Sequence, residues 1–180
     1  MERVVKPTQL RHCIEELLKL STMTLATVGS SGAVHAADVY FACDENSTLL
    51  FFSDASSQHS RDMHEKPQAA LTIHTDRDGY EQILGLQMRG TVREITSESA
   101  WQQAWGIYVK KFPFARDLEE VIKVNQFYGF SPSWIRLVDN SQGFGFKQEW
   151  QEIISEQDGK EFRYWGLLAG SRPEPGSKND

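Results

Sequence analysis

Cysteine, long apolar runs and basic clusters are all scarce in this 180-residue sequence, and each absence excludes a class of protein. Two cysteines, Cys13 and Cys43, cannot form a disulfide framework, and free thiols are typical of a reducing compartment. No apolar run approaches the ~18 residues that a membrane span needs, and the first residues contain no apolar signal segment. The sequence therefore predicts a cytoplasmic protein that does not associate with a membrane.

Positive charge is limited as well. The formal net charge is -6, and Lys110-Lys111 is the only basic cluster. Proteins that bind a nucleic-acid backbone present clustered Lys and Arg side chains. We therefore expect no nucleic-acid partner.

The motifs of several common enzyme folds are also missing. No Gly-x-Gly-x-x-Gly, P-loop or Gly-x-Ser-x-Gly pattern occurs, which argues against a Rossmann, NTPase or hydrolase site. His59 and His64 are five residues apart, so their rings do not share one helical face, and no cysteine or third histidine is nearby. We expect no metal site.

The composition is that of an ordinary globular protein. Apolar residues make up 39% and charged residues 24% of the chain, and 180 residues suit one domain. A chain of this length buries roughly 70% of its extended surface. Five Trp and ten Phe provide bulky side chains for the core.

Periodicity predicts mostly short antiparallel strands, with helices before and between them. The 3.6-residue pattern predicts helices over 8–20 and 97–110, a short helix within 56–66, and a further amphipathic stretch after Pro113. Alternating and β-branched runs predict strands over 22–28, 33–42, 48–53, 69–75, 81–95, 133–138, 144–154 and 160–168. Short polar turns favour a meander of the first five strands, with bends at Gly85 and Gly90. The pattern indicates a small antiparallel β-barrel, all-β with flanking helices, and a tail over 171–180.

Four passages, in this order, resemble the pyridoxamine 5'-phosphate oxidase-like FMN-binding split-barrel family, and in particular a poorly characterised bacterial branch of it. They are the hairpin Thr22-Met-Thr-Leu-Ala-Thr-Val-Gly with His35-Ala-Ala-Asp-Val-Tyr-Phe; Phe51-Phe-Ser53 with Ser57-Gln-His-Ser-Arg-Asp-Met63 and Lys66-Pro-Gln-Ala-Ala-Leu-Thr72; Gly85-Leu-Gln-Met-Arg-Gly90; and Lys111-Phe-Pro-Phe-Ala-Arg116 with Asn140-Ser-Gln-Gly-Phe-Gly145. The resemblance covers about residues 8–150. It implies a flavin-binding domain over 1–150, and it leaves 151–180 as a C-terminal hairpin and tail.

The resemblance implies a homodimer with one FMN in each of two subunit-interface sites. The backbone of Thr24, Leu25, Ala26 and Thr27 would run along the flavin. The phosphate would be held by Ser53, Ser57, His59 and Arg61, while Gln87 would bond the polar ring edge and Trp134 would shield it. The residues alone permit plainer readings: 54–66 as a polar loop and capped helix, Gln87 as a solvent-facing strand residue, and Trp134 as core packing.

One position departs from the family pattern. His59 stands where the family has a phosphate-binding lysine, and a histidine is neutral for much of its time near pH 7. Arg61 is the candidate to compensate. If it does not, the site has decayed and the protein is a dimer without a ligand.

The expected function is FMN-dependent redox chemistry on a small molecule, with no general acid or base assigned and the electron donor open. A true pyridoxamine phosphate oxidase is disfavoured because the C-terminal Arg-x-His segment of that enzyme is absent. The alternative is a non-catalytic carrier or sensor of flavin or haem, with His35, His59 or His64 as the haem ligand.

Overall fold

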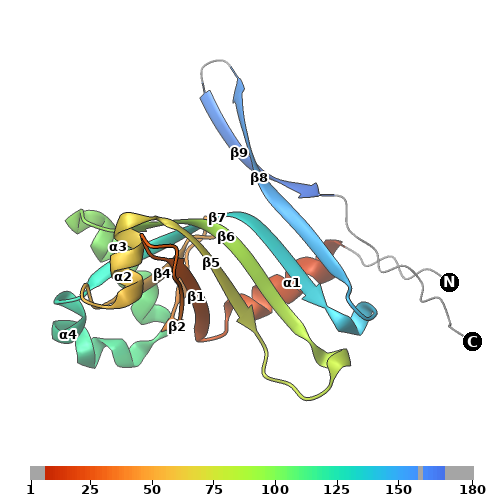
Figure 1. The fold of residues 1–180 in the computed structure, drawn as a ribbon, viewed down its shortest axis with the longest axis horizontal. Coiled ribbons are helices and arrows are strands. Elements are labelled where there is room, and N and C mark those ends of the chain that lie inside the picture. The colour runs from red at the N-terminus through yellow and green to blue at the C-terminus, as the bar shows by residue number, and fades with distance from the viewer. Residues whose placement is uncertain (1–6, 158–159, 169–180) are drawn as a thin grey trace, which may run out of the picture.

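The structure is a computed structural model that describes residues 7–157 and 160–168, with side chains for 11–154 and 165–168. One antiparallel sheet of nine described strands curls into a half-barrel (Figure 1). The strands are β1 (Thr22–Val28), β2 (Val34–Tyr40), β3 (Ala42–Cys43), β4 (Leu49–Ser53), β5 (Gln68–His74), β6 (Leu84–Glu94), β7 (Gln126–Asp139), β8 (Lys147–Gln157) and β9 (Lys160–Leu168). This confirms the predicted split barrel.

The order of the strands corrects the predicted meander. The sheet runs β2-β1-β5-β6-β7-β4-β3, and β8 pairs with β7 and β9. The third predicted strand, β4, therefore pairs with β7 and not with β2. Turn signals report only neighbours along the chain, such as the short pairing of β3 with β4, whereas β7 lies more than 70 residues from β4 in sequence.

Helices flank this sheet. They are α1 (Pro7–Leu18), α2 (Gln58–Glu65), α3 (Glu98–Lys111) and α4 (Glu119–Lys123), with 3-10 turns η1 (Tyr80–Gln82), η2 (Pro113–Leu118) and η3 (Asn140–Gln142). Ser57 caps α2 by accepting a hydrogen bond from the Ser60 amide, and Ser97 caps α3 by accepting one from the Ala100 amide. Both caps fix where a helix begins.

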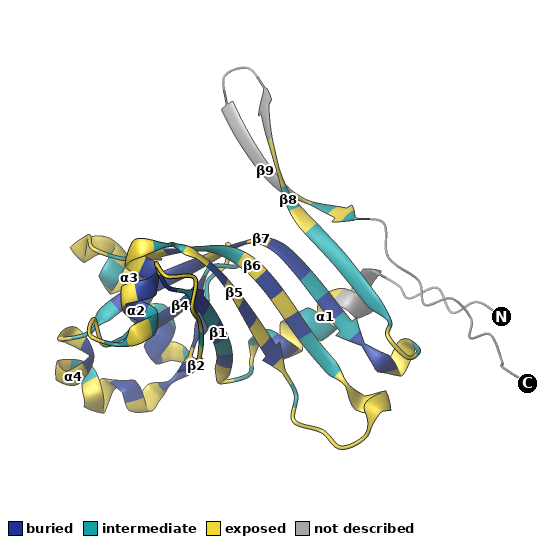
Figure 2. Ribbon diagram, in the orientation of Figure 1, coloured by how far each residue is buried: buried dark blue, intermediate teal, exposed yellow. Residues whose placement is uncertain are grey.

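Two hydrophobic clusters share the sheet. The barrel core lies inside the curl and the helical core lies under α3, η2 and α4. In β4, Leu49 and Phe51 pack into the barrel core, while Leu50 and Phe52 pack into the helical core. The first half of β7 is likewise buried on both faces (Figure 2). It lacks the alternation that marks a half-buried strand, which is why the sequence predicted only 133–138.

A β-bulge in β7 sits opposite Gly90. Arg89 pairs with Trp134, whereas Gly90 pairs with Pro132, so Ser133 has no partner in β6. A Cβ at position 90 would lie 2.2 Å from a backbone oxygen of β7, so only glycine fits there. The prediction of a bend is confirmed at Gly90, while the ladder passes Gly85 without a shift.

The bulge reverses the alternation along β7. Before it, Tyr128 and Phe130 face the barrel core; after it, Ile135 and Leu137 do. Trp134 and Arg136 consequently project from the opposite side of the sheet, here called the outer face. By the same pairing, the outer face also carries Thr24, Ala26, Ala70, Thr72, Gln87, Arg89, Glu149 and Gln151.

The C-terminal hairpin leaves the barrel. β8 pairs with β7 as far as the Trp134–Gln151 pair, and beyond that point its only described partner is β9 (Figure 1). The predicted hairpin is thus confirmed, whereas its tip at 158–159 and the predicted tail lie outside the described residues. No described helix is both long and apolar enough to span a bilayer.

Candidate functional site

A cluster of hydroxyl and imidazole groups forms where β4 ends and α2 begins. The Ser53 Oγ lies 2.6 Å from the His59 Nε2 and 3.2 Å from the Ser57 Oγ. The Ser57 Oγ lies 3.2 Å from the same ring nitrogen. Three residues predicted to hold a phosphate, from a strand end and two positions of a helix start, therefore converge. We call them the α2 start cluster.

The charge of this cluster depends on His59. Partial burial lowers the pKa of His59 below its ordinary value, and the nearby Asp62 carboxylate only partly offsets that effect. At neutral pH the ring is therefore mostly uncharged. It can donate or accept one hydrogen bond at Nε2, but it brings little positive charge to an anion.

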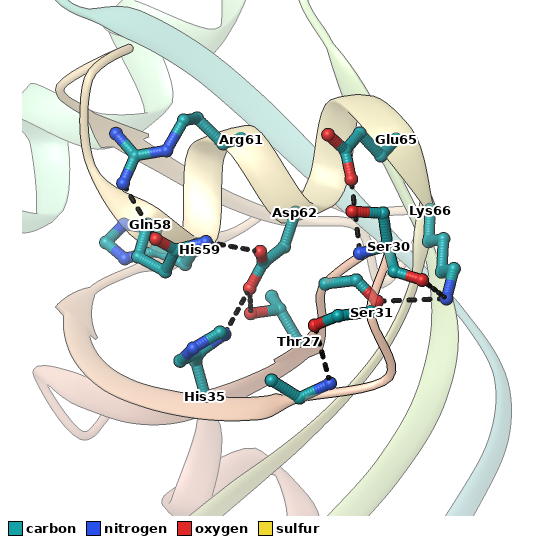
Figure 3. A network of polar contacts seen from close by, with 12 residues as sticks. Thr27, Ser30, Ser31, His35, Gln58, His59, Arg61, Asp62, Glu65 and Lys66 are labelled. Carbon is teal, nitrogen blue, oxygen red and sulfur yellow. Dashed lines mark hydrogen bonds and ion pairs between the residues drawn. The ribbon is translucent and has the colours of Figure 1, made fainter.

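Arg61, the fourth residue predicted for the phosphate, points elsewhere. Its guanidinium donates to the Ser56 carbonyl. It also donates to the Gln58 Oε1 at 2.7 Å (Figure 3). The side chain is exposed, so it can swing toward an anion at the cost of these two bonds. The structure places Arg61 beside the cluster without joining it.

One helical turn away, Asp62 is the centre of a buried network that sequence reasoning missed. Its side chain is 2% exposed, and its carboxylate lies 2.7 Å from the Thr27 Oγ1, 2.8 Å from the Gln58 Nε2 and 2.8 Å from the His35 Nδ1 (Figure 3). Burial by itself raises the pKa of Asp62, but the bonds from Gln58, Thr27 and His35 outweigh it and lower the pKa. Asp62 is therefore a buried, ionised carboxylate that accepts hydrogen bonds from three side chains.

This network fastens α2 onto the β1–β2 hairpin. Lys66 supports it by donating to the carbonyls of Gly29 and Ser30, and Glu65 accepts from the Ser30 amide. A signal for this network was present in the sequence. Asp62 stands next to Met63 in a short helix, and an acid on the buried side of a helix needs hydrogen-bond partners.

The four β1 residues predicted to line a flavin have different environments. Leu25 is fully buried in the barrel core, and the Thr27 hydroxyl donates its hydrogen bond to Asp62. Thr24 donates to Asp38 at 2.6 Å, on the outer face. Ala26 also lies on the outer face, where it pairs with Ala36 on one side and Ala70 on the other.

Gln87 and Trp134 lie on the outer face, on the neighbouring strands β6 and β7. Cross-strand pairing aligns Thr24, Thr72, Gln87, Arg136 and Glu149 in one row across five strands. Arg136 donates to the Gln87 Oε1 at 3.3 Å. Trp134 is 9% exposed because two guanidinium groups cover its ring, Arg89 at 4.3 Å and Arg136 at 4.8 Å.

The third histidine considered as a haem ligand, His64, has protein partners. His64 lies 3.3 Å from the Gln126 Oε1 and 3.7 Å from the Glu94 Oε2. Within the described residues, no three His, Cys, Asp or Glu side chains are arranged to hold a metal ion.

Comparison with known proteins finds sequence relatives that cover about two thirds of the chain. The family model described as pyridoxamine 5'-phosphate oxidase matches residues 10–139. A UPF0306 protein from Yersinia pseudotuberculosis is 29% identical over 136 residues, which is 69% of this chain and 92% of that protein.

Two solved structures share the fold at low sequence identity. A haem-binding protein from Mycobacterium smegmatis has a TM-score of 0.67 at 15% identity, with 82% of this chain and 60% of that chain covered. A pyridoxamine 5'-phosphate oxidase-related, FMN-binding protein from Nostoc punctiforme has a TM-score of 0.60 at 12% identity, with 94% and 100% covered. Because the family model spans well over half of the sequence, the chain belongs to the pyridoxamine 5'-phosphate oxidase family.

Proposed function

We propose that the protein is a homodimer that binds FMN and carries out flavin-dependent redox chemistry on a small molecule. The observation that carries this proposal is the α2 start cluster, in which Ser53, Ser57 and His59 lie within 2.6–3.2 Å of one another. The FMN-binding protein of the same fold supports the choice of cofactor.

The cluster fits a phosphate in hydrogen-bonding capacity. Two hydroxyls and an imidazole are joined by the first backbone amides of α2, which as a class lack helical acceptors and favour an anion. The fit in charge is weaker, because His59 is mostly neutral and Arg61 is turned toward Ser56 and Gln58. We expect Arg61 to swing onto a bound phosphate, since a guanidinium grips phosphate oxygens bidentately.

The outer face fits a flat ring. Ala26 and Ala70 are small, so they leave room above β1 and β5, and Gln87 stands on the next strand. A second copy over this face would shield the ring from water, and Trp134 would stand at its border. FMN, when bound, supplies the electron transfer, and the chain supplies binding and orientation.

The visible absorption spectrum, before and after loading with excess FMN and desalting, tests the proposal. Flavin bands that stay with the protein are expected. A protein that stays colourless after loading contradicts FMN binding. If the flavin bands stay with the protein, reduced nicotinamides are screened as electron donors for the loaded protein.

A non-catalytic carrier or sensor of flavin or haem is the second candidate. His35 bonds a buried carboxylate through Nδ1, which is the arrangement that orients histidines that bind metals through the other nitrogen. The haem-binding protein of the same fold is consistent with it. A Soret band after haem loading, lost in His35→Ala and kept in His64→Ala, would favour haem over FMN.

We also propose that residues 1–150 form the flavin-binding unit. A chain without residues 151–180 should then keep its FMN affinity. Its mass in solution, measured separately, shows whether the hairpin contributes to the dimer instead.

A further inference from the structure

Three side chains link the C-terminal hairpin to Gln87 across the outer face. The Glu149 Oε1 on β8 accepts from the Arg136 Nε at 2.9 Å and lies 2.8 Å from the Nη2. The remaining terminal nitrogen, Nη1, donates to the Gln87 Oε1 at 3.3 Å. The Glu149 carboxylate on β8 thus fixes the Arg136 guanidinium on β7, and this guanidinium fixes the Gln87 amide on β6.

The second oxygen of Glu149 is also used. Its Oε2 accepts from the Trp134 Nε1 at 3.2 Å, so one carboxylate holds both side chains of the stack. Burial by itself raises the pKa of Glu149, but the bonds from Arg136 and Trp134 outweigh it and lower the pKa. Glu149 is 19% and Arg136 31% exposed, so solvent screens the pair only in part.

The donors and acceptors in this series of hydrogen bonds can be arranged in only one way. Arginine and indole groups only donate hydrogen bonds, so the amide of Gln87 must turn its oxygen toward Arg136. The Gln87 NH2 group is then the end that remains for a ligand. Arg89, stacked on the same Trp134, adds a guanidinium with no carboxylate partner among the described residues.

We propose that Glu149 and Arg136 are positioning residues that fix Gln87 as a hydrogen-bond donor toward a ligand edge that only accepts. The ligand edge is a carbonyl, a deprotonated ring nitrogen or another anionic group. This inference rests on the proposed flavin site, and it gives the hairpin strand β8 a part in that site.

The variant that tests the polarity is Gln87→Glu. A glutamate keeps an acceptor for Arg136, but it turns an acceptor toward the ligand in place of the NH2 group. FMN affinity, measured by quenching of flavin fluorescence, should fall about tenfold or more, and further than in Gln87→Ala. Arg93→Gln, an exposed arginine on the same strand, is the control and should bind FMN normally. Wild-type affinity in Gln87→Glu would overturn the proposal.

Glu149→Gln tests the positioning. The glutamine NH2 group takes the place of one carboxylate oxygen, so it faces a donor, either Arg136 or Trp134, and that bond is lost. FMN affinity should fall severalfold in the wild-type background and hardly change in a Gln87→Ala background. A loss of the same size in both backgrounds means that Glu149 acts only on the fold, and it overturns the proposal.

A measurement without FMN separates this inference from the proposed function. The side-chain NH2 signals of Gln87 in the NMR spectrum should show a restrained amide in the wild-type protein and a mobile one in Glu149→Gln. Equal mobility in both proteins overturns the positioning role. Failure of the wild-type protein to bind FMN, with Gln87 restrained as expected, overturns the proposed cofactor alone.

Discussion

Asp62 and His59 lie three residues apart on one short helix, yet their surroundings differ in kind. Asp62 is buried, and its oxygens accept hydrogen bonds from three side chains on three elements, β1, β2 and α2. His59 is half-buried, and its Nε2 lies near the hydroxyls of Ser53 and Ser57, which also bond each other. The buried network holds the helix in place, whereas the half-buried groups beside it can exchange their mutual hydrogen bonds for bonds to a ligand. Within one turn of α2, one residue therefore stabilises the fold and another is available to bind a ligand.

The largest expected effect comes from Asp62→Asn. The amide group must face a donor, either Thr27 or Gln58 or His35, so at least one buried bond is lost along with the charge. The free energy of unfolding should fall by about 3 kcal/mol. Chemical denaturation measures it, and Glu65→Gln, an exposed acid on the same helix, should change it by less than about 0.5 kcal/mol.

The same residue predicts a response to acid. The pKa of Asp62 in the folded protein lies below its unfolded value of about 3.9. The stability that ionised Asp62 contributes to the folded protein is fully present above the unfolded pKa, and it is lost as the pH falls through the folded pKa. Wild-type stability should therefore drop more steeply than that of Asp62→Asn at pH below about 4. Parallel acid curves would contradict the role given to this carboxylate.

A smaller loss is expected from Thr27→Val, which removes one donor to Asp62 while keeping the shape of the side chain. The unfolding free energy should fall by about 1.5 kcal/mol. Thr24→Val on the same strand removes a bond to Asp38, which is exposed, and should cost clearly less. If both variants lose the same unfolding free energy, the buried hydrogen bond stabilises the fold no more than the exposed one.

On the binding side, His59→Lys should strengthen FMN binding. A lysine is charged at neutral pH, whereas the lowered pKa of His59 leaves the imidazole mostly neutral. We expect an affinity gain of about tenfold with little change in stability. Titration of both proteins with FMN measures it. Unchanged affinity would remove charge as the weakness of this site.

The smallest effect is the pH dependence of FMN affinity. Protonated His59 attracts phosphate, so affinity should rise severalfold only as the pH drops below the ordinary histidine pKa of about 6.5. His59→Gln lacks that rise, and the ratio of the two affinities cancels protonation of the phosphate itself. A ratio independent of pH would falsify the participation of His59.

The sequence allowed the elements to be predicted where local signals are strong, and less where partners are distant. The helices within 56–66 and over 97–110 and the bend at Gly90 follow from local chemistry. The pairing of β4 with β7 and the first half of β7 do not, because long-range contacts and burial on both faces leave no periodic signal.

The candidate site divides in the same way. The convergence of Ser53, Ser57 and His59 followed from the family resemblance, and it needed one strand end and one helix start. The links from Asp62 to His35 and from Glu149 to Gln87 join residues 27 and 62 positions apart. Such links depend on the register between strands, which local patterns do not specify.

The unpaired Ser133 gives β7 one residue more than its ladder with β6 uses. A one-residue deletion between Ser131 and Trp134 would remove this extra residue and leave a regular ladder, in which Ile135 still faces the barrel core and Trp134 still faces outward. A one-residue deletion elsewhere in the paired part of β7 has no such spare residue, so it would turn every side chain beyond it to the other face. Over evolutionary time, the length of β7 should therefore vary by one residue at the bulge and hardly at all elsewhere.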